Sequence, residues 1–283
     1  MLESVSQSLA GRCAVLHLLP LSRGEIIRFE RHPRGLDESL VAGGYPRIFD
    51  RGLDPSDWLR SYAATYVERD VRTISNVAEL VTFQRFVELC AGRTSQLLNY
   101  SALAADCGIS QPTAKAWLGV LETSYIAFRL PAFSANLRKR LVKMPKLHFY
   151  DSGLVGWLLG VRNVDHLRAH PLRGAIFESW AVSEIVKHRT ARGETAGLYH
   201  YRDQNATEVD LVVDGPTGLT LVEAQVAQTV SPRTLTALRR VRDLLAGARA
   251  CSTLLAYGGD QHQTRSDLSL VPWSRLHQED WVG

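Results

Sequence analysis

A predicted β-hairpin in the last third of the chain most limits how this sequence can fold. Residues 208–213, EVDLVV, and residues 219–225, LTLVEAQ, both have the composition of buried strands. The five residues between them, DGPTG, are turn-forming. An isolated hairpin is only marginally stable in water, so this hairpin predicts a larger sheet to which both strands belong.

The hairpin also carries the clearest candidate for chemistry. If it is symmetric about the centre of its turn, Asp210 faces Glu223 and Glu208 faces Gln225. Strand residues two apart point the same way, so these four side chains would form one polar patch on an apolar ribbon. Carboxylates in that arrangement suit a hard divalent cation. The alternative is a set of solvated acids at a strand end with no chemical role.

The flanking sequence predicts the rest of this sheet. A helix opens at Arg173 and runs to about His188, and the hairpin follows it. A helix over 234–245 and a strand over 252–257 come next. This order of helix, strand, hairpin strand, helix and strand predicts a mixed α/β sandwich.

Length and composition are those of a soluble globular protein of up to two domains. The chain has 283 residues, 45% hydrophobic and 22% charged, with a net charge of +4. No apolar run approaches the roughly 20 residues that span a bilayer, and no signal peptide is recognisable. We therefore expect a cytoplasmic protein with no membrane partner. Four scattered cysteines predict neither a zinc site nor disulfides: Cys13, Cys90, Cys107 and Cys251.

Residues 77–150 carry the pattern of a winged helix. An amphipathic helix over 81–92 is followed by a short helix that Ser101 would cap and a second that Ser110 would cap. Helix, glycine-containing turn and helix form the helix-turn-helix pattern. Two strand-like pieces follow, over 126–130 and 146–150.

The wing is basic, which suits a phosphate backbone. Six cations and no acid lie between Thr123 and Tyr150: Arg129, Arg138, Lys139, Arg140, Lys143 and Lys146. The outward face of the second helix offers Gln111, Thr113 and Lys115 to base edges. Nucleic acid is therefore one expected partner. The alternative is a winged helix that only packs domains together.

The N-terminal part reads as helical apart from one strand. A helix end over 4–11 precedes a buried strand over 14–18, and Ser22 with Glu25 predicts a capping box. Helices are expected from Asp37 to about Asn76, the longest starting at Pro55. Residues 151–170 read as a glycine-containing link.

Several short segments, in order, resemble a family of bacterial and archaeal AAA-type ATP-binding proteins with a C-terminal domain of unknown function 4143. The segments are SLAGRCAVLHLLPLSRGEI at 8–26, GGYPRIFDR at 43–51, YVERDV at 66–71, FESWAVSEIVK at 177–187, YRDQNATEVDLVV at 201–213 and LVEAQ at 221–225. The resemblance implies four parts: a remnant of the ATPase core (1–27), a helical lid or connector (28–76), a winged helix (77–150) and a nuclease-like α/β domain (151–283). In that family Arg12 would lie near a subunit boundary, although a surface arginine is the simpler interpretation.

The sequence departs from that family at the nucleotide site. It contains no GxxxxGK[ST] loop, so it lacks the backbone amides and lysine that cradle phosphates. ATP is expected as a cofactor only if a missing N-terminal ATPase core exists. ATPase partner subunits or a second copy of the chain are the protein partners that the resemblance implies.

The α/β layout resembles the restriction-endonuclease-like (PD-(D/E)XK) fold. The resemblance places Glu178 at the helix acid, Asp210 at the metal aspartate and Glu223 at the first residue of Glu-x-Lys, with Mg²⁺ as the implied cofactor. Gln225 stands at the lysine position, and an amide neither carries charge nor takes a proton. Lys187 points to the opposite side of its helix, and Arg202 is a poor base that could clamp a phosphate.

These features predict a non-catalytic protein that binds nucleic acid or partner subunits. One alternative is a magnesium-dependent nuclease using Glu178, Asp210 and Glu223 with a displaced activating group. Another is an oligomerisation scaffold built on the helical region and the winged helix.

Overall fold

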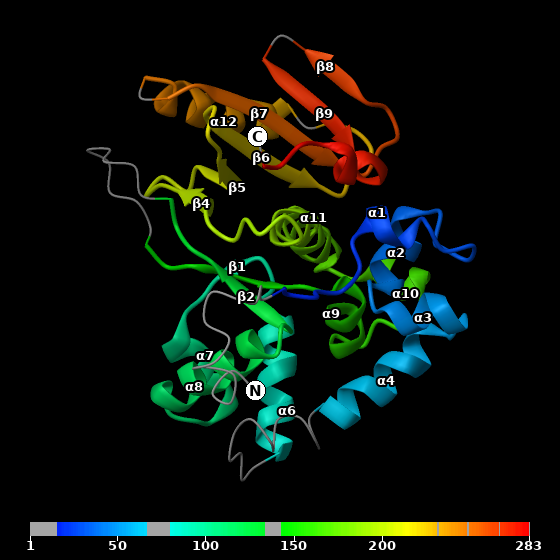
Figure 1. Cartoon of the computed structure of the whole chain (residues 1–283). Coiled ribbons are helices and arrows are strands. Elements are labelled where there is room, and N and C mark those ends of the chain that lie inside the picture. The colour runs from blue at the N-terminus through cyan, green and yellow to red at the C-terminus, as the bar shows by residue number, and fades with distance from the viewer. Residues whose placement is uncertain are drawn as a thin grey trace, which may run out of the picture.

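The computed structural model describes residues 16–66, 80–133, 143–230, 232–247, 249–265 and 267–282. Arg12, the helix predicted over 4–11 and the residues expected to be helical after Tyr66 lie outside these ranges. Within them, helices and two sheets form a mixed α/β protein, which confirms the predicted fold class (Figure 1).

The N-terminal region is helical, as its sequence predicts. Ser22 and Glu25 form the predicted capping box at the first helix. Asp54 caps the longest of the four by accepting a hydrogen bond from the amide of Asp57. The helices are α1 (Arg23–Ile26), α2 (Leu36–Ala42), α3 (Pro46–Arg51) and α4 (Pro55–Thr65).

The prediction of a strand over 14–18 is wrong for residues 16–18, the part of it that the structure describes. Residues 16–18 belong to neither sheet, and Leu16 and Leu18 are 82% and 91% exposed. A strand is stable only beside another strand, and neither sheet takes this segment into its described ladders.

The elements predicted for a winged helix are present, namely three helices and a small antiparallel sheet. Asn99 caps its second helix, because that helix begins at Tyr100 rather than after Ser101 as predicted. Ser110 caps the third helix, which confirms that prediction. The helices are α6 (Leu80–Ala91), α7 (Tyr100–Cys107) and α8 (Gln111–Thr123). The sheet has the order β1 (Gln96–Leu97), β3 (Lys146–Phe149), β2 (Ala127–Leu130).

Residues 151–170 are not a link, contrary to prediction. They form α9 (Ser152–Leu158) and α10 (Val164–Ala169). Asp151 caps α9 by accepting a hydrogen bond from the amide of Leu154, and its other oxygen accepts one from the amide of Gly44. Gly153 lies in α9 because a side chain there would meet the backbone of Gly43 at 2.9 Å. The glycine therefore serves close helix packing.

The C-terminal half is a six-stranded mixed sheet with a helix on each face. Its order is β4 (Leu198–Arg202), β5 (Glu208–Asp214), β6 (Leu219–Gln225), β7 (Cys251–Tyr257), β9 (Leu268–Pro272), β8 (Gln263–Arg265). β7 runs parallel to β6 and β9, and the other pairs are antiparallel. The sequence did not predict β8, β9 or the 3₁₀ helix η2 (Trp273–Gln278).

The helix α11 (Arg173–Thr190) joins the two sheets. It packs against β3 of the wing and against β5 and β6 of the large sheet (Figure 1). The helix α12 (Pro232–Leu245) covers the opposite face of the large sheet, with Leu238, Val241 and Leu245 buried there. One apolar cluster continues from the winged helix through α9 and α11 into the large sheet. The wing is therefore part of the core that holds the α/β half.

The predicted hairpin has the predicted centre. Leu211 pairs with Val222 and Asp214 with Leu219, which is the register of a hairpin symmetric about its turn. The register of β4 against β5, by contrast, shifts by one residue at a β-bulge. That bulge shapes the candidate site.

Candidate functional site

A buried lysine from the wing lies among carboxylates of the α/β half. Lys146 is 2% exposed, and its Nζ is 2.7 Å from Oε1 of Glu178 on α11. The same Nζ is 3.1 Å from Oδ1 of Asp210 and forms an ion pair with Oε1 of Glu208, both on β5. One ammonium thus holds three acids from two other elements.

The bulge in β5 lets Asp210 reach this lysine. The β4–β5 register shifts between Tyr199 and Tyr201, so His200 alone faces both Asp210 and Leu211. Leu211 belongs to the apolar cluster of α11, and Asp210 contacts the ammonium that lies on that side. Bulges aim neighbouring side chains at one face where regular pleating would separate them.

Beside this bulge the predicted polar patch is only partly formed. The β5–β6 ladder runs from the turn to the Leu211–Val222 pair and stops there. The predicted pairs of Asp210 with Glu223 and of Glu208 with Gln225 are therefore not part of it. Oε2 of Glu208 instead accepts from Arg202 at 2.6 Å. Gln225 donates from Nε2 to the carbonyl of Thr229 at 3.2 Å.

Glu223 lies beside this cluster without sharing its cation. Its Oε2 is buried and has no hydrogen-bond partner among the described residues. The other hairpin acid is better supported, because Oδ2 of Asp210 accepts a hydrogen bond from the amide of Ala224 at 3.0 Å.

The electrostatics of the cluster favour a charged lysine. Burial would lower the pKa of Lys146, but the carboxylates of Asp210, Glu178 and Glu208 together outweigh burial and raise that pKa. Burial, then the charge of Asp210, holds the pKa of Glu178 and of Glu223 well above the ordinary value. Lys146 is therefore locked as a cation, and a charged ammonium cannot accept a proton as a general base.

Two buried histidines adjoin the lysine. His148 is two residues along β3 and His200 lies opposite the bulge, and neither is exposed. Burial, then the charge of Lys146, holds the pKa of His148 well below its usual value, and burial also lowers the pKa of His200. Both rings are thus neutral at physiological pH. Nε2 of His200 contacts the carbonyl of Met144 at 2.9 Å.

The structure brings some of the predicted nuclease residues together. Glu178 and Asp210 share Lys146, Glu223 adjoins them, and Gln225 turns to the following loop. The sequence did not single out Lys146 or the two histidines for this site. Within the described ranges, no three Asp, Glu, His or Cys side chains are grouped so that they could hold a metal ion.

Lys187, a possible substitute for the lysine missing at position 225, points away from the carboxylate cluster, as predicted. Nζ of Lys187 is 3.2 Å from Oε1 of Glu184 and 3.2 Å from the carbonyl of Leu21. It is buried on the side of α11 that faces the N-terminal segment.

The predicted nucleic-acid residues divide into four groups. The prediction that Lys146 contacts phosphate is wrong, because its side chain is buried among acids from the other half of the chain. The guanidinium of Arg129 is held by both carboxylate oxygens of Glu122, at 2.6 and 2.8 Å. Arg138, Lys139 and Arg140 lie outside the described residues. Arg129 is exposed, and the other exposed members among the described residues are Gln111, Lys115 and Lys143, with Thr113 half-buried beside Ser110.

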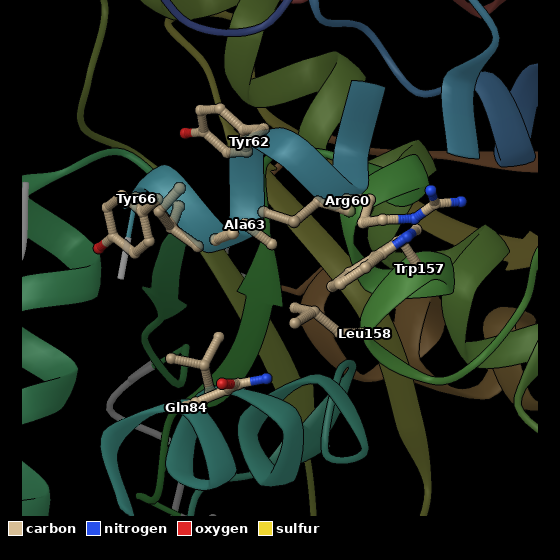
Figure 2. Close-up of a pocket in the computed structure, with 11 residues that line it drawn as sticks. Arg60, Tyr62, Ala63, Tyr66, Gln84, Trp157 and Leu158 are labelled. Atoms are coloured by element: carbon tan, nitrogen blue, oxygen red, sulfur yellow. The ribbon is translucent and has the colours of Figure 1, made fainter. Parts of the chain in front are cut away.

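A separate cavity of about 210 Å³ lies between α4, α6 and α9. Figure 2 shows Tyr62, Tyr66 and Ala63 on one side, with Leu158 and Gln84 opposite them. Its lining is mainly apolar and contains none of the acids at Lys146. The cavity is therefore distinct from the carboxylate cluster.

Comparisons with known proteins agree on domains whose function is not defined. A domain of unknown function, DUF8612, matches residues 33–165, and another, DUF4143, matches residues 173–276. The chain is 26% identical over 267 residues to two uncharacterized proteins, Rv2008c of Mycobacterium tuberculosis and Mb2031c of Mycobacterium bovis. These matches cover 93% of this chain but 57% of each relative, so the chain spans little more than half their length. No solved structure matches it significantly.

The α/β half of the chain thus carries the match to DUF4143. Among the described residues, no helix is both long and apolar enough to cross a bilayer.

Proposed function

We propose that this chain is the C-terminal part of an AAA-type ATP-binding protein and works as a non-catalytic nucleic-acid-binding protein. Its motifs resemble that family, and the DUF4143 match supports the assignment of the α/β half. The greater length of the mycobacterial relatives supports a longer parent architecture.

One observation carries the non-catalytic part of the proposal. The ammonium of Lys146 lies where Glu178, Glu208 and Asp210 converge, and it is buried. A nuclease needs those oxygens for a metal ion and needs a base that can take a proton. Here the oxygens are engaged by a side chain whose raised pKa keeps it charged.

The nucleic-acid part rests on the helix-turn-helix. α8 is its second helix, and Gln111 and Lys115 are exposed near the N-terminal end of α8. This is the end of a recognition helix that contacts base edges in the major groove. Lys115 also lies 5.6 Å from the ring centre of Tyr100, which restrains its direction.

The test is a titration of the purified chain with labelled duplex DNA at several salt concentrations. Lys115→Glu should weaken binding by about 5- to 150-fold, because one good contact is worth about 1–3 kcal/mol. Arg240→Glu, an exposed charge reversal on α12, should bind like the wild type. Failure of the wild-type chain to bind DNA even at low salt would overturn the nucleic-acid part and favour partner binding. Clear binding of ATP would overturn the non-catalytic assignment.

A second candidate is a magnesium-dependent nuclease in which Lys146 replaces the missing lysine of Glu-x-Lys. The observation in its favour is that Nζ of Lys146 reaches both Glu178 and Asp210. Metal-dependent DNA cleavage that disappears in Asp210→Ala would establish it. Cleavage created only by Gln225→Lys would instead identify an eroded site.

A further inference from the structure

The carboxylate cluster has more acid than the buried lysine neutralises. Three carboxylates contact Lys146, and Glu223 adjoins them. Arg202 pairs with the outer oxygen of Glu208. Among the described residues, two cations therefore face four carboxyl groups, in a region that is buried around Lys146 and half-buried around Arg202. Buried carboxylates of this density are stable only beside a cation.

Carboxylate oxygens are suitable magnesium ligands, but their arrangement here does not fit a bound metal ion. They converge on Nζ of Lys146, which lies 2.7 Å from Glu178 and 3.1 Å from Asp210. A divalent ion at this point would overlap the ammonium and repel it. The cation and the lysine therefore compete for the same oxygens.

The lysine comes from a different part of the chain than the acids. Lys146 opens β3 of the wing, next to Leu147, whereas the acids lie on α11 and β5. The wing packs on α11 through β3. The ammonium therefore adds a polar contact at the centre of an apolar interface.

We propose that Lys146 is the resident cation of this site, supplied by the wing in place of a divalent metal ion, and that it fastens the wing to the α/β half. This deepens the proposed function and rests on its non-catalytic part. The expected consequence is that, once the ammonium is removed, the freed carboxylates bind a divalent cation that the wild-type chain does not bind there.

The experiment compares thermal unfolding of the wild type and Lys146→Met with and without MnCl₂. Methionine keeps most of the length of the side chain and removes its charge. The variant should unfold at a lower temperature, and Mn²⁺ should restore roughly 5 °C or more once it is well above its Kd. The wild type should shift by less than about 1 °C, since its ammonium already fills the site.

Lys187→Met is the matched control. Lys187 is also a buried lysine of this core, but among the described residues it forms an ion pair with Glu184 alone, with Asp151 as a more distant acid. Its loss should destabilise the chain without any rescue by Mn²⁺. Equal rescue of the two variants would show a nonspecific effect of the ion and overturn the proposal. Lack of rescue in Lys146→Met would overturn it as well.

A second measurement counts the Mn²⁺ ions that the folded chain binds. Bound Mn²⁺ is counted by electron paramagnetic resonance in the wild type and in Asp210→Asn. The proposal expects no difference in bound Mn²⁺, and binding that Asp210→Asn abolishes would overturn it. Neither readout involves DNA, so these outcomes are independent of the Lys115→Glu titration.

Discussion

Nζ of Lys146 and Oε1 of Glu178 are 2.7 Å apart, although one belongs to a short strand of the wing and the other to the helix beneath the large sheet. This contact connects two parts of the chain that the sequence treats as separate domains.

Loss of the buried ammonium should cost far more than loss of a neighbouring surface charge. Lys146→Met leaves three carboxylates facing each other, and removing one partner of a buried ion pair costs about 3–5 kcal/mol. Lys143→Met removes an exposed lysine three residues earlier and should change stability by less than about 0.5 kcal/mol. Urea denaturation of both variants measures the difference. Equal effects would mean that the cluster contributes nothing beyond surface charge.

Glu223→Gln should stabilise the protein at neutral and alkaline pH. Burial and the nearby acids raise the pKa of Glu223 in the folded chain. A raised pKa favours folding below the unfolded value, near 4.3, and that contribution is lost as pH rises through the folded value. The glutamine does not titrate, so its advantage should be largest near pH 8 and should vanish near pH 4. Unfolding temperatures measured across this range check the sign, and a constant difference would contradict it.

A second buried acid should hold the helical region to α11. Asp37 on α2 accepts from Nε of Arg168 at 3.0 Å and from Nε of Arg173 at 2.8 Å. Asp37→Asn should cost about 1–3 kcal/mol, the typical value of hydrogen bonds to charged groups. The control is Asp165→Asn, an exposed acid 3.7 Å from the same Arg168, which should cost less than about 0.5 kcal/mol. Denaturant titrations of the two variants distinguish these outcomes.

Two helical glycines should respond oppositely to alanine. In Gly153→Ala the new Cβ would lie 2.9 Å from the backbone nitrogen of Gly43, and overpacking of this kind costs about 1–3 kcal/mol. In Gly119→Ala the new Cβ meets nothing within 4 Å, so the gain in helix propensity should stabilise α8 by about 0.5–1 kcal/mol. Thermal unfolding of each variant measures the sign. Stabilisation by both substitutions would show that α9 does not need its close approach to α2.

The sequence correctly predicts the features that depend on turn-forming and helix-capping residues. The hairpin centre, the Ser110 cap and the Ser22–Glu25 box follow from turn and capping chemistry, and all three are present. The failures depended on tertiary context. The glycines of 151–170 suggested a link, yet Gly153 and Gly156 lie in a helix that packs closely on its neighbours.

The candidate site was half predictable from the sequence. The order of elements along the chain predicts Glu178, Asp210 and Glu223, whereas the cationic neighbours of Lys146 in the sequence indicate a basic wing. Its acid partners are 32 and 64 residues away, and no local pattern reports a contact over that distance. The position of Lys146 in its strand could have indicated this contact. It begins a strand whose four residues are all buried, and a buried lysine needs a partner.

The order of these contacts along the chain also affects how the protein is made. Lys146 is synthesised 64 residues before Asp210. At typical elongation rates of about 5–20 residues per second, several seconds therefore pass before Asp210 can reach the lysine. In the second half of that interval Glu178 has been synthesised, but the set of acids around the ammonium is still incomplete. Final closure of the wing thus becomes a late step of folding, which follows the arrival of the α/β half.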